Sequence, residues 1–133
     1  MKTKISRSQT VKKLDSVFSQ FIRLRDSVDG YASCVTCGGT KPWKEQQCGH
    51  FFTRGRYATR WDENNCFTQD YRCNVALNGN YINYTKYMID HFGREFVDAL
   101  EMKSLLSIKV TTIELNEKIT HYTQKVKELQ SQL

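Results

Sequence analysis

Four residues in the middle of the chain have the types and spacing of zinc ligands. Cys34 and Cys37 are separated by two residues and followed by two glycines, a pattern typical of a zinc knuckle, in which the backbone turns beneath two thiolates. Asp70 and Cys73 repeat this spacing, with a carboxylate where a second thiolate is usual. Because zinc also accepts aspartate oxygen, we predict that Cys34, Cys37, Asp70 and Cys73 hold one structural zinc ion.

A further cysteine competes for the fourth ligand position. The distance along the chain from Cys66 to Cys73 fits a shared helical turn less well than that from Asp70, so Asp70 is favoured and Cys66 stays open as the alternative. The chain has five cysteines, an odd number, and begins without the apolar stretch of an export signal. Metal ligation is therefore favoured over a framework of disulfides.

A histidine and two asparagines lie among these ligands. His50 and Asn65 fall between the two ligand pairs, and Asn74 directly follows Cys73. A lone histidine is more often a hydrogen-bonded core residue than a catalytic one. This order, however, resembles the motif of HNH nucleases in a histidine-asparagine-asparagine form. We therefore predict a catalytic site formed by His50, Asn65 and Asn74.

The chain is basic, with 20 Lys and Arg against 14 Asp and Glu and a formal net charge of +6. Arg54, Arg56 and Arg60 stand between the predicted catalytic histidine and asparagine, with no acidic residue among them. Guanidinium groups bind backbone phosphates, and aromatic rings stack on exposed bases. We predict DNA as the partner, bound by these arginines and Tyr57, whereas Trp61 is as well suited to the core as to stacking.

Helical segments flank this centre. Apolar residues at three- and four-residue steps predict a helix over 8–27, closed by Gly30, and a second helical region over 81–106 that Gly93 divides. Thr111 and Glu114 fit a capping box at the start of a last helix, in which the threonine accepts from a first-turn amide and the glutamate from the cap amide.

The last helix carries an apolar seam. Its residues alternate in four- and three-residue steps: Leu115, Ile119, Tyr122, Val126, Leu129 and Leu133. Two partners are open for this seam, the first helix of the same chain or a second copy in a homodimer. The first is favoured because the run is short for a coiled coil.

Length and composition predict a single α+β domain over 1–133, with an N-terminal helix (8–27), a loop-rich centre (31–80) and C-terminal helices (81–133). The 133 residues suffice for one modest core, and all five cysteines, both tryptophans and the only proline fall in the centre. No apolar run approaches the roughly 18 residues of a membrane span, so we expect no membrane association and a cytoplasmic location.

The ordered set of these segments resembles the phage NinG (Rap) recombination family from about residue 10 to residue 130. The resemblance implies a small zinc-stapled ββα-metal centre, HNH-like and of the treble-clef type, flanked by helices. It also implies a phage-encoded protein in the bacterial host cytoplasm, with metal-dependent endonuclease activity on branched recombination intermediates such as Holliday junctions, displacement loops or flaps. The matching stretches are 21–26, 34–37, 49–51, 60–63 with 65, 73–74 and 79–80.

The resemblance also implies a role for each predicted catalytic residue. His50 is the general base that takes a proton from the attacking water, and Asn65 orients its imidazole through a hydrogen bond. Asn74 binds a catalytic Mg²⁺ or Mn²⁺ ion. Two positions depart from the family pattern: Gly49 stands where many HNH sites have an acidic metal ligand, and Asp70 stands where a cysteine is expected.

The missing acidic ligand leaves alternatives open. Glu45, Asp62 or Glu63 are candidates to complete the shell of the catalytic ion. If none does, the chain is a non-catalytic, zinc-containing DNA-binding protein that assists recombination. A third interpretation is a dimeric adaptor built on the C-terminal seam.

Overall fold

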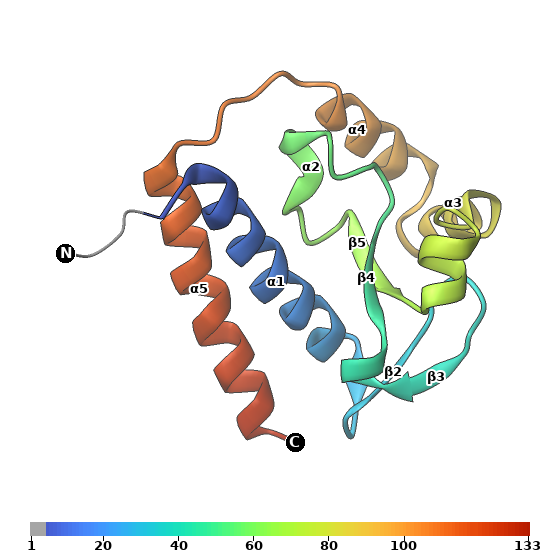
Figure 1. Cartoon of the computed structure of the whole chain (residues 1–133). Coiled ribbons are helices and arrows are strands. Elements are labelled where there is room, and N and C mark those ends of the chain that lie inside the picture. Colours follow the sequence, from blue (N-terminus) through green and yellow to red (C-terminus); the bar gives the residue numbers. More distant parts are fainter. Residues whose placement is uncertain (1–4) are drawn as a thin grey trace.

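Two parallel helices form one side of the molecule. The structure is a computed structural model that describes residues 5–133. α1 spans Arg7–Arg25 and α5 spans Thr112–Ser131, and Figure 1 shows them side by side and running in the same direction. A capping box begins α1, because the Ser6 hydroxyl accepts from the Gln9 N–H while the Gln9 side chain accepts from the Ser6 N–H.

The apolar seam of α5 packs on α1. The ring of Tyr122 lies 4.9 Å from that of Phe18 and 5.0 Å from that of Phe21. At the start of α5 the Thr111 hydroxyl accepts from the Glu114 N–H as expected, but the glutamate accepts from that hydroxyl and not from the cap amide. Of the two partners considered for the seam, the structure shows the chain's own first helix. The buried seam residues are Leu115, Ile119, Tyr122 and Val126.

The C-terminal end of α1 is hydrogen-bonded to the centre of the molecule. The Arg25 guanidinium donates to the carbonyls of Glu63 and Cys66 at 2.8 Å each. The Asp26 carboxylate accepts from the backbone N–H and the hydroxyl of Thr68. These bonds attach the end of the helix to β5 (Cys66–Gln69). The helix ends at Arg25, two residues before the expected boundary.

The centre consists of two small antiparallel sheets. β1 (Ser27–Val28), β2 (Tyr31–Ser33) and β3 (Thr40–Pro42) pair in that order. β4 (Gln47–His50) pairs with β5 (Cys66–Gln69), with His50 opposite Cys66. Short helical turns complete it: η1 (Trp43–Glu45), α2 (Tyr57–Arg60) between β4 and β5, and η2 (Arg72–Ala76), a π-helical turn after β5. The architecture is α+β.

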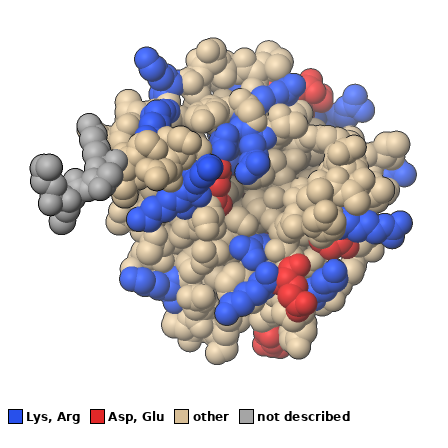
Figure 2. All heavy atoms as spheres, in the orientation of Figure 1, with Lys and Arg blue, Asp and Glu red and all other residues tan. Residues whose placement is uncertain are grey.

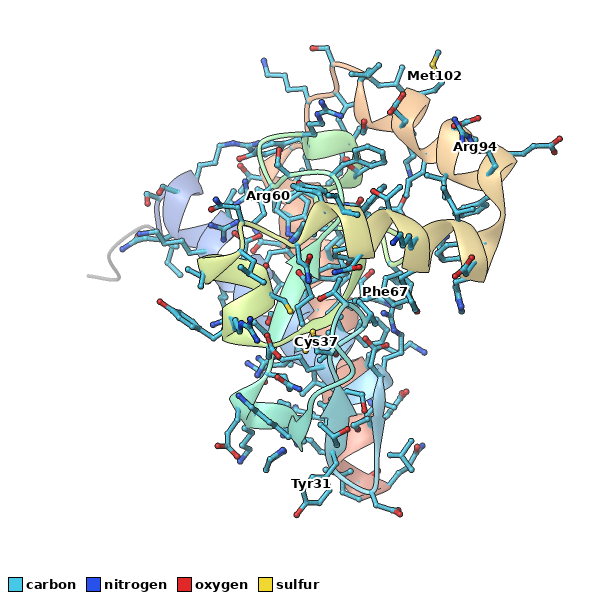
Figure 3. All side chains as sticks on the ribbon, turned by 90° about the vertical axis from the view of Figure 1, so that its right-hand side faces the viewer. Tyr31, Cys37, Arg60, Phe67, Arg94 and Met102 are labelled. Carbon is cyan, nitrogen blue, oxygen red and sulfur yellow. The ribbon has the colours of Figure 1, made fainter. Side chains whose placement is uncertain are left out.

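The β4–β5 hairpin lies between two apolar cores. Successive residues of a strand point to opposite faces, so Cys66 enters the core beneath α1 and α5. Phe67, which is labelled in Figure 3, enters a second core with Tyr84 and Met88. The second core is covered by α3 (Tyr81–Phe92) and α4 (Arg94–Ser104). Gly93 divides these helices where expected, at a φ of +87° that favours glycine.

Within residues 5–133, the structure has no helix with the length and apolarity needed to cross a membrane.

Candidate metal centre and adjoining groove

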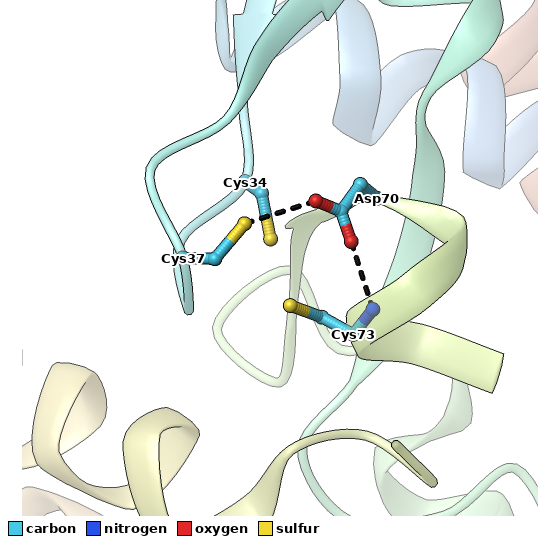
Figure 4. Close-up of side chains that lie close together, drawn as sticks. All are labelled: Cys34, Cys37, Asp70 and Cys73. Atoms are coloured by element: carbon cyan, nitrogen blue, oxygen red, sulfur yellow. Dashed lines mark hydrogen bonds between the residues drawn. The ribbon is translucent and has the colours of Figure 1, made fainter. Parts of the chain in front are cut away.

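The predicted zinc ligands come together at the edge of the centre. Cys34 and Cys37 lie on the turn after β2, and Asp70 and Cys73 lie where β5 gives way to η2. Their ligand atoms are all within 4.8 Å of one another (Figure 4). Cys66, the alternative fourth ligand, is absent from this cluster, because it points into the core beneath α1.

Local backbone structure explains how each half of the cluster forms. In the first half, the Cys34 N–H donates to the Gly39 carbonyl and the Gly38 N–H donates to the Cys34 carbonyl, which closes a tight turn. Gly38 adopts a φ of +81°, a conformation that side chains disfavour. In the second half, Asp70 Oδ1 accepts from the Cys73 N–H at 2.8 Å, so the aspartate also caps the turn that carries the last cysteine.

A hydrogen bond joins two of the candidate ligands, Cys37 and Asp70. The Cys37 thiol donates to Asp70 Oδ2 at 2.9 Å, and this hydrogen bond raises the pKa of Cys37 to about 12 and lowers that of Asp70. Burial raises the pKa of Cys34, but hydrogen bonds from Thr36 and neighbouring backbone groups outweigh it and lower the pKa overall. A metal ion bound here would displace the proton that Cys37 donates to Asp70. Three sulfurs and one carboxylate oxygen fit a metal such as zinc.

His50 ends β4 and is held by a backbone carbonyl. Its Nε2 lies 2.8 Å from the Arg60 carbonyl oxygen. Because a carbonyl can only accept, Nε2 carries the hydrogen and Nδ1 keeps a free lone pair. Burial lowers the pKa of His50 to about 4. The Arg60 carbonyl opposes this shift, whereas the charge of Arg54 adds to it. The ring is therefore neutral at neutral pH, with Nδ1 as its proton-accepting atom.

The structure corrects the role expected for Asn65. The predicted hydrogen bond from Asn65 to the imidazole is not made. Instead Asn65, which is fully buried, donates to the carbonyls of Phe52 and Thr59 and accepts from the Phe52 N–H. These bonds fix the loop between β4 and α2, and so Asn65 holds the Arg60 carbonyl in place without touching His50.

His50 and Asn74 border one groove. Its volume is about 910 Å³. Asn74 lies on η2 and donates through Nδ2 to Gln47 Oε1 at 2.7 Å, so its own Oδ1 takes no part in that bond. The groove is lined by Asp15, Ser19, Arg23, Gln46, Gln47, Cys48, His50, Thr53, Arg54, Asn74, Val75, Asn78, Gly79 and Tyr81.

Only one of the three predicted phosphate-binding arginines lines this groove. Arg54 does so, with 64% of its side chain exposed. Arg60 instead makes a two-point ion pair with Asp15, at 2.6 and 3.1 Å, and its side chain is only 14% exposed. Arg56 donates to the Ser104 hydroxyl of α4 at 2.8 Å. Arg56 and Arg60 therefore do not line this groove, because acceptors far away in the sequence engage both guanidinium groups.

The aromatic residues of this segment serve the core. Tyr57 packs edge-on against Trp61, at 5.5 Å between ring centroids, and is absent from the groove. Trp61 is buried and donates from its indole to Asp15. Of the two roles considered for Trp61, the structure shows the core position, and Tyr57 is next to it.

Sequence reasoning missed the contribution of α1 to the groove. Asp15, Ser19 and Arg23 line it from one face of the helix, four residues apart. Arg23 donates to the Trp43 carbonyl and to Ser19, which leaves its guanidinium fixed at the rim. The signal was available as a polar stripe at helical spacing within an otherwise apolar helix. Figure 2 shows basic side chains around a hollow in the middle of one face of the molecule.

None of the three acidic residues considered for a second ion reaches the groove. Asp62 pairs with Lys103, Glu63 accepts from the Tyr122 hydroxyl, and Glu45 is exposed on η1.

The structure also explains why position 49 is a glycine, because a Cβ at this position would lie 2.0 Å from Gln69 Oε1. Gln69 therefore fills the space that a side chain at position 49 would need.

The fold and the site define a small α+β protein in which a cysteine-rich cluster that could hold a metal ion adjoins a groove bordered by basic residues. The sequence model of the family described as "Bacteriophage Lambda NinG protein" matches residues 1–132, and the chain belongs to this family. No solved structure matches it.

Curated relatives agree with this assignment. The chain is 30% identical over 126 residues to Protein ninG of Escherichia phage 933W, covering 94% of this chain and 60% of the relative. It is 31% identical over 124 residues to Protein ninG of Salmonella phage P22, covering 92% and 59%. It is 32% identical over 127 residues to Protein ninG of Escherichia phage lambda, covering 94% and 59%. The chain thus spans about three fifths of the length of these phage proteins.

Proposed function

We propose that the chain is a metal-dependent DNA endonuclease of the HNH-like, ββα-metal (treble-clef) type, acting on branched recombination intermediates. The observation that carries the proposal is the neutral His50. The Arg60 carbonyl fixes its tautomer, and the ring borders the same groove as Asn74 and two arginines. The arrangement of a cysteine turn, a hairpin and a helical turn around one candidate metal cluster supports it.

The residues of the groove have separate tasks in this proposal. His50 accepts a proton from the attacking water at Nδ1, while the Arg60 carbonyl holds Nε2–H. Asn65 keeps the loop that carries this carbonyl in place. Asn74 offers its amide oxygen to a Mg²⁺ or Mn²⁺ ion, which in such a site stabilises the charge on the leaving oxygen. Within residues 5–133, Asp15 is the only carboxylate that lines the groove, and three donors already engage it.

DNA binding rests on the arginines at the rim. Arg54, on the loop after β4, and Arg23, on α1, both line the groove, so each can contact a phosphate of a bound strand. Arg60 and Arg56 are held by Asp15 and Ser104, and Tyr57, which lies between them in the sequence, packs against Trp61. Because each neutralised phosphate releases counterions, we expect affinity to fall steeply with salt. Arg54→Ala should lower the slope of that dependence by about one unit.

The test is a cleavage assay with labelled four-way junctions, displacement loops, flaps and linear duplex, in Mg²⁺, Mn²⁺ or chelator. His50→Ala should lower cleavage by about 10² to 10⁴-fold, because it removes the general base. His121→Ala, on the exposed face of α5, is the matched control and should cleave like the parent. Circular dichroism should be the same in all three proteins, and each should keep the zinc held by Cys34, Cys37, Asp70 and Cys73. Equal cleavage by His50→Ala and the parent would show that the base is wrongly assigned.

Sedimentation of the same samples tests whether two copies of the chain associate through α5.

One observation favours a second candidate, a non-catalytic DNA-binding protein that assists recombination. Gly49 supplies no ligand beside His50, and the space is filled by Gln69, an uncharged side chain. A chain of this kind binds junctions in a salt-dependent way and leaves them intact in both Mg²⁺ and Mn²⁺. The assay above therefore separates the two candidates.

A further inference from the structure

Two cysteines outside the first cluster lie beside His50. Cys48 and His50 are two residues apart on β4 and therefore point to the same face, and Cys66 is the strand partner of His50 on β5. The ligand atoms of these three residues are all within 4.8 Å of one another. The two clusters share no residue, and the second one uses both cysteines that the first leaves out.

We propose that Cys48, His50 and Cys66 form a second metal site, selective for a soft divalent cation such as zinc, and that an ion bound there switches off His50. The site is distinct from the four-residue cluster at Cys34. Its metal-binding part stands by itself, whereas the switch rests on the proposed function of His50 as a base.

The donor set decides which cations fit. Two thiolates and one imidazole suit zinc and other thiophilic ions and do not suit Mg²⁺, which prefers oxygen. Two thiolates also balance the charge of a divalent ion, so the filled site adds no net charge to the buried face of the hairpin. Three protein ligands leave one position open, as in zinc sites that bind water or another small ligand.

Access to the site comes from the groove. Cys48 and His50 both line it, whereas Cys66 is fully buried behind them. An incoming ion therefore meets Cys48 and the imidazole first and is then enclosed by Cys66. The open fourth position consequently faces the groove, where a water molecule or a phosphate oxygen can occupy it.

The strand register argues for a metal ion and against a disulfide. Cys48 lies opposite Thr68, and Cys66 lies opposite His50, so the two cysteines are diagonal neighbours. Diagonal pairs on adjacent strands are farther apart than pairs directly opposite, and a disulfide needs its two Cβ atoms within about 4.5 Å. A metal ion bridges two sulfurs across a longer gap than a covalent bond does.

Metal binding at either ring nitrogen removes the base. An ion on Nδ1 occupies the lone pair that would accept the proton. An ion on Nε2 displaces the hydrogen bond to the Arg60 carbonyl, now 2.8 Å long, and the ring proton moves to Nδ1. In both cases the imidazole no longer accepts a proton from water, whichever nitrogen the ion selects.

The experiment counts metal ions in the full chain, purified under reducing conditions, stripped with chelator and titrated with Cd²⁺. The parent should bind two ions per chain, whereas Cys66→Ala and Cys48→Ser should each bind one. Cys37→Ser is the matched control, because it damages the first cluster and leaves the second intact. Thiolate-to-metal absorbance gives a second readout: three thiolates serve the first ion and two the second, so the second increment should be about two-thirds of the first.

The outcomes separate the two parts of the proposal. One ion per chain in the parent, or two ions in both Cys48→Ser and Cys66→Ala, would overturn the site. Far-ultraviolet circular dichroism checks that each variant folds, and the half-buried Cys48 provides a milder change than the fully buried Cys66.

Zinc inhibition tests the switch. With saturating Mg²⁺, added Zn²⁺ should lower junction cleavage by the parent about tenfold or more, each protein being compared with its own zinc-free rate. Cys66→Ala should lose most of this sensitivity. Equal inhibition of both proteins would refute the switch while leaving the site intact. A parent that binds two ions and never cleaves would refute the proposed endonuclease and the switch, but not the site.

Discussion

The Asp15 carboxylate organises the loop that holds His50, and its removal is the sharpest test of this architecture. Asp15 accepts from Arg60 at 2.6 and 3.1 Å and from the Trp61 indole at 3.0 Å. The side chains of Asp15 and Arg60 are only 17% and 14% exposed. Asp15→Asn keeps the shape of the side chain but leaves the buried guanidinium without its counter-charge.

The burial of this ion pair determines how much stability Asp15→Asn should lose. Breaking a buried ion pair by removing one partner costs about 3 to 5 kcal/mol, and the partial exposure of this pair selects the lower end of that range. We expect Asp15→Asn to lower the free energy of unfolding by about 3 kcal/mol. The assay is urea denaturation of the zinc-loaded chain, followed by tryptophan fluorescence, which also reports on Trp61.

Asp98→Asn is the matched control. Asp98 faces Arg94 at 3.8 Å on the surface of α4, and both side chains are more than two-thirds exposed. Exposed pairs contribute about 0.5 kcal/mol or less, so this variant should unfold almost like the parent. If Asp15→Asn costs no more than Asp98→Asn, Arg60 is not held by this ion pair and the explanation for its absence from the groove fails.

Three further changes test the metal cluster, the histidine and the hairpin. Asp70→Ala should weaken zinc binding about tenfold or more, as measured by competition with a chromophoric chelator. The pKa of His50, lowered from its ordinary 6.5 to about 4, makes the unfolded chain bind more protons between these values. Its contribution to stability is therefore present above pH 6.5 and lost as the pH falls through about 4, which NMR titration of the ring and denaturation beside His50→Gln can measure. Gly49→Ala should cost about 1 to 3 kcal/mol, because the new Cβ meets the amide of Gln69, and Gln69→Ala in the same chain should recover part of it.

Each of these changes has a result that contradicts its reasoning. Unchanged zinc affinity in Asp70→Ala would remove Asp70 from the ligand set. A ring titration near 6.5 would mean that His50 is solvated in solution. If Gly49→Ala loses the same stability with and without Gln69→Ala, the contact between the two side chains is not the cause.

The ligand cluster was accessible to sequence reasoning because metal ligation has strict local rules. A pair of donors two residues apart must lie on one turn, so Cys34 with Cys37 and Asp70 with Cys73 are recognisable as half-sites. Helices were equally accessible, since the repeat of apolar residues follows from helical geometry. The preference for Asp70 over Cys66 came from the same rule of spacing, and the structure brings Asp70 to the cluster.

The groove was harder to predict because charged side chains do not reveal their partners. Arg54, Arg56 and Arg60 look equivalent in the sequence. In the structure, Arg60 forms an ion pair with Asp15 and Arg56 donates to Ser104. Of the three, only Arg54 lines the groove. Asn65 was expected to bind His50, yet its bonds go to backbone groups of the intervening loop.

The amino-acid sequence by itself determined the helices, the half-sites of the metal cluster and the membership of the chain in a phage protein family. Only the tertiary structure decided which carbonyl holds His50, which arginines border the groove, and that Cys48 and Cys66 meet beside the imidazole. The physical reason is distance along the chain. Helical repeats and ligand pairs involve residues within one or two turns, whereas ion pairs and strand register join positions that approach only after the hairpin has packed against α1.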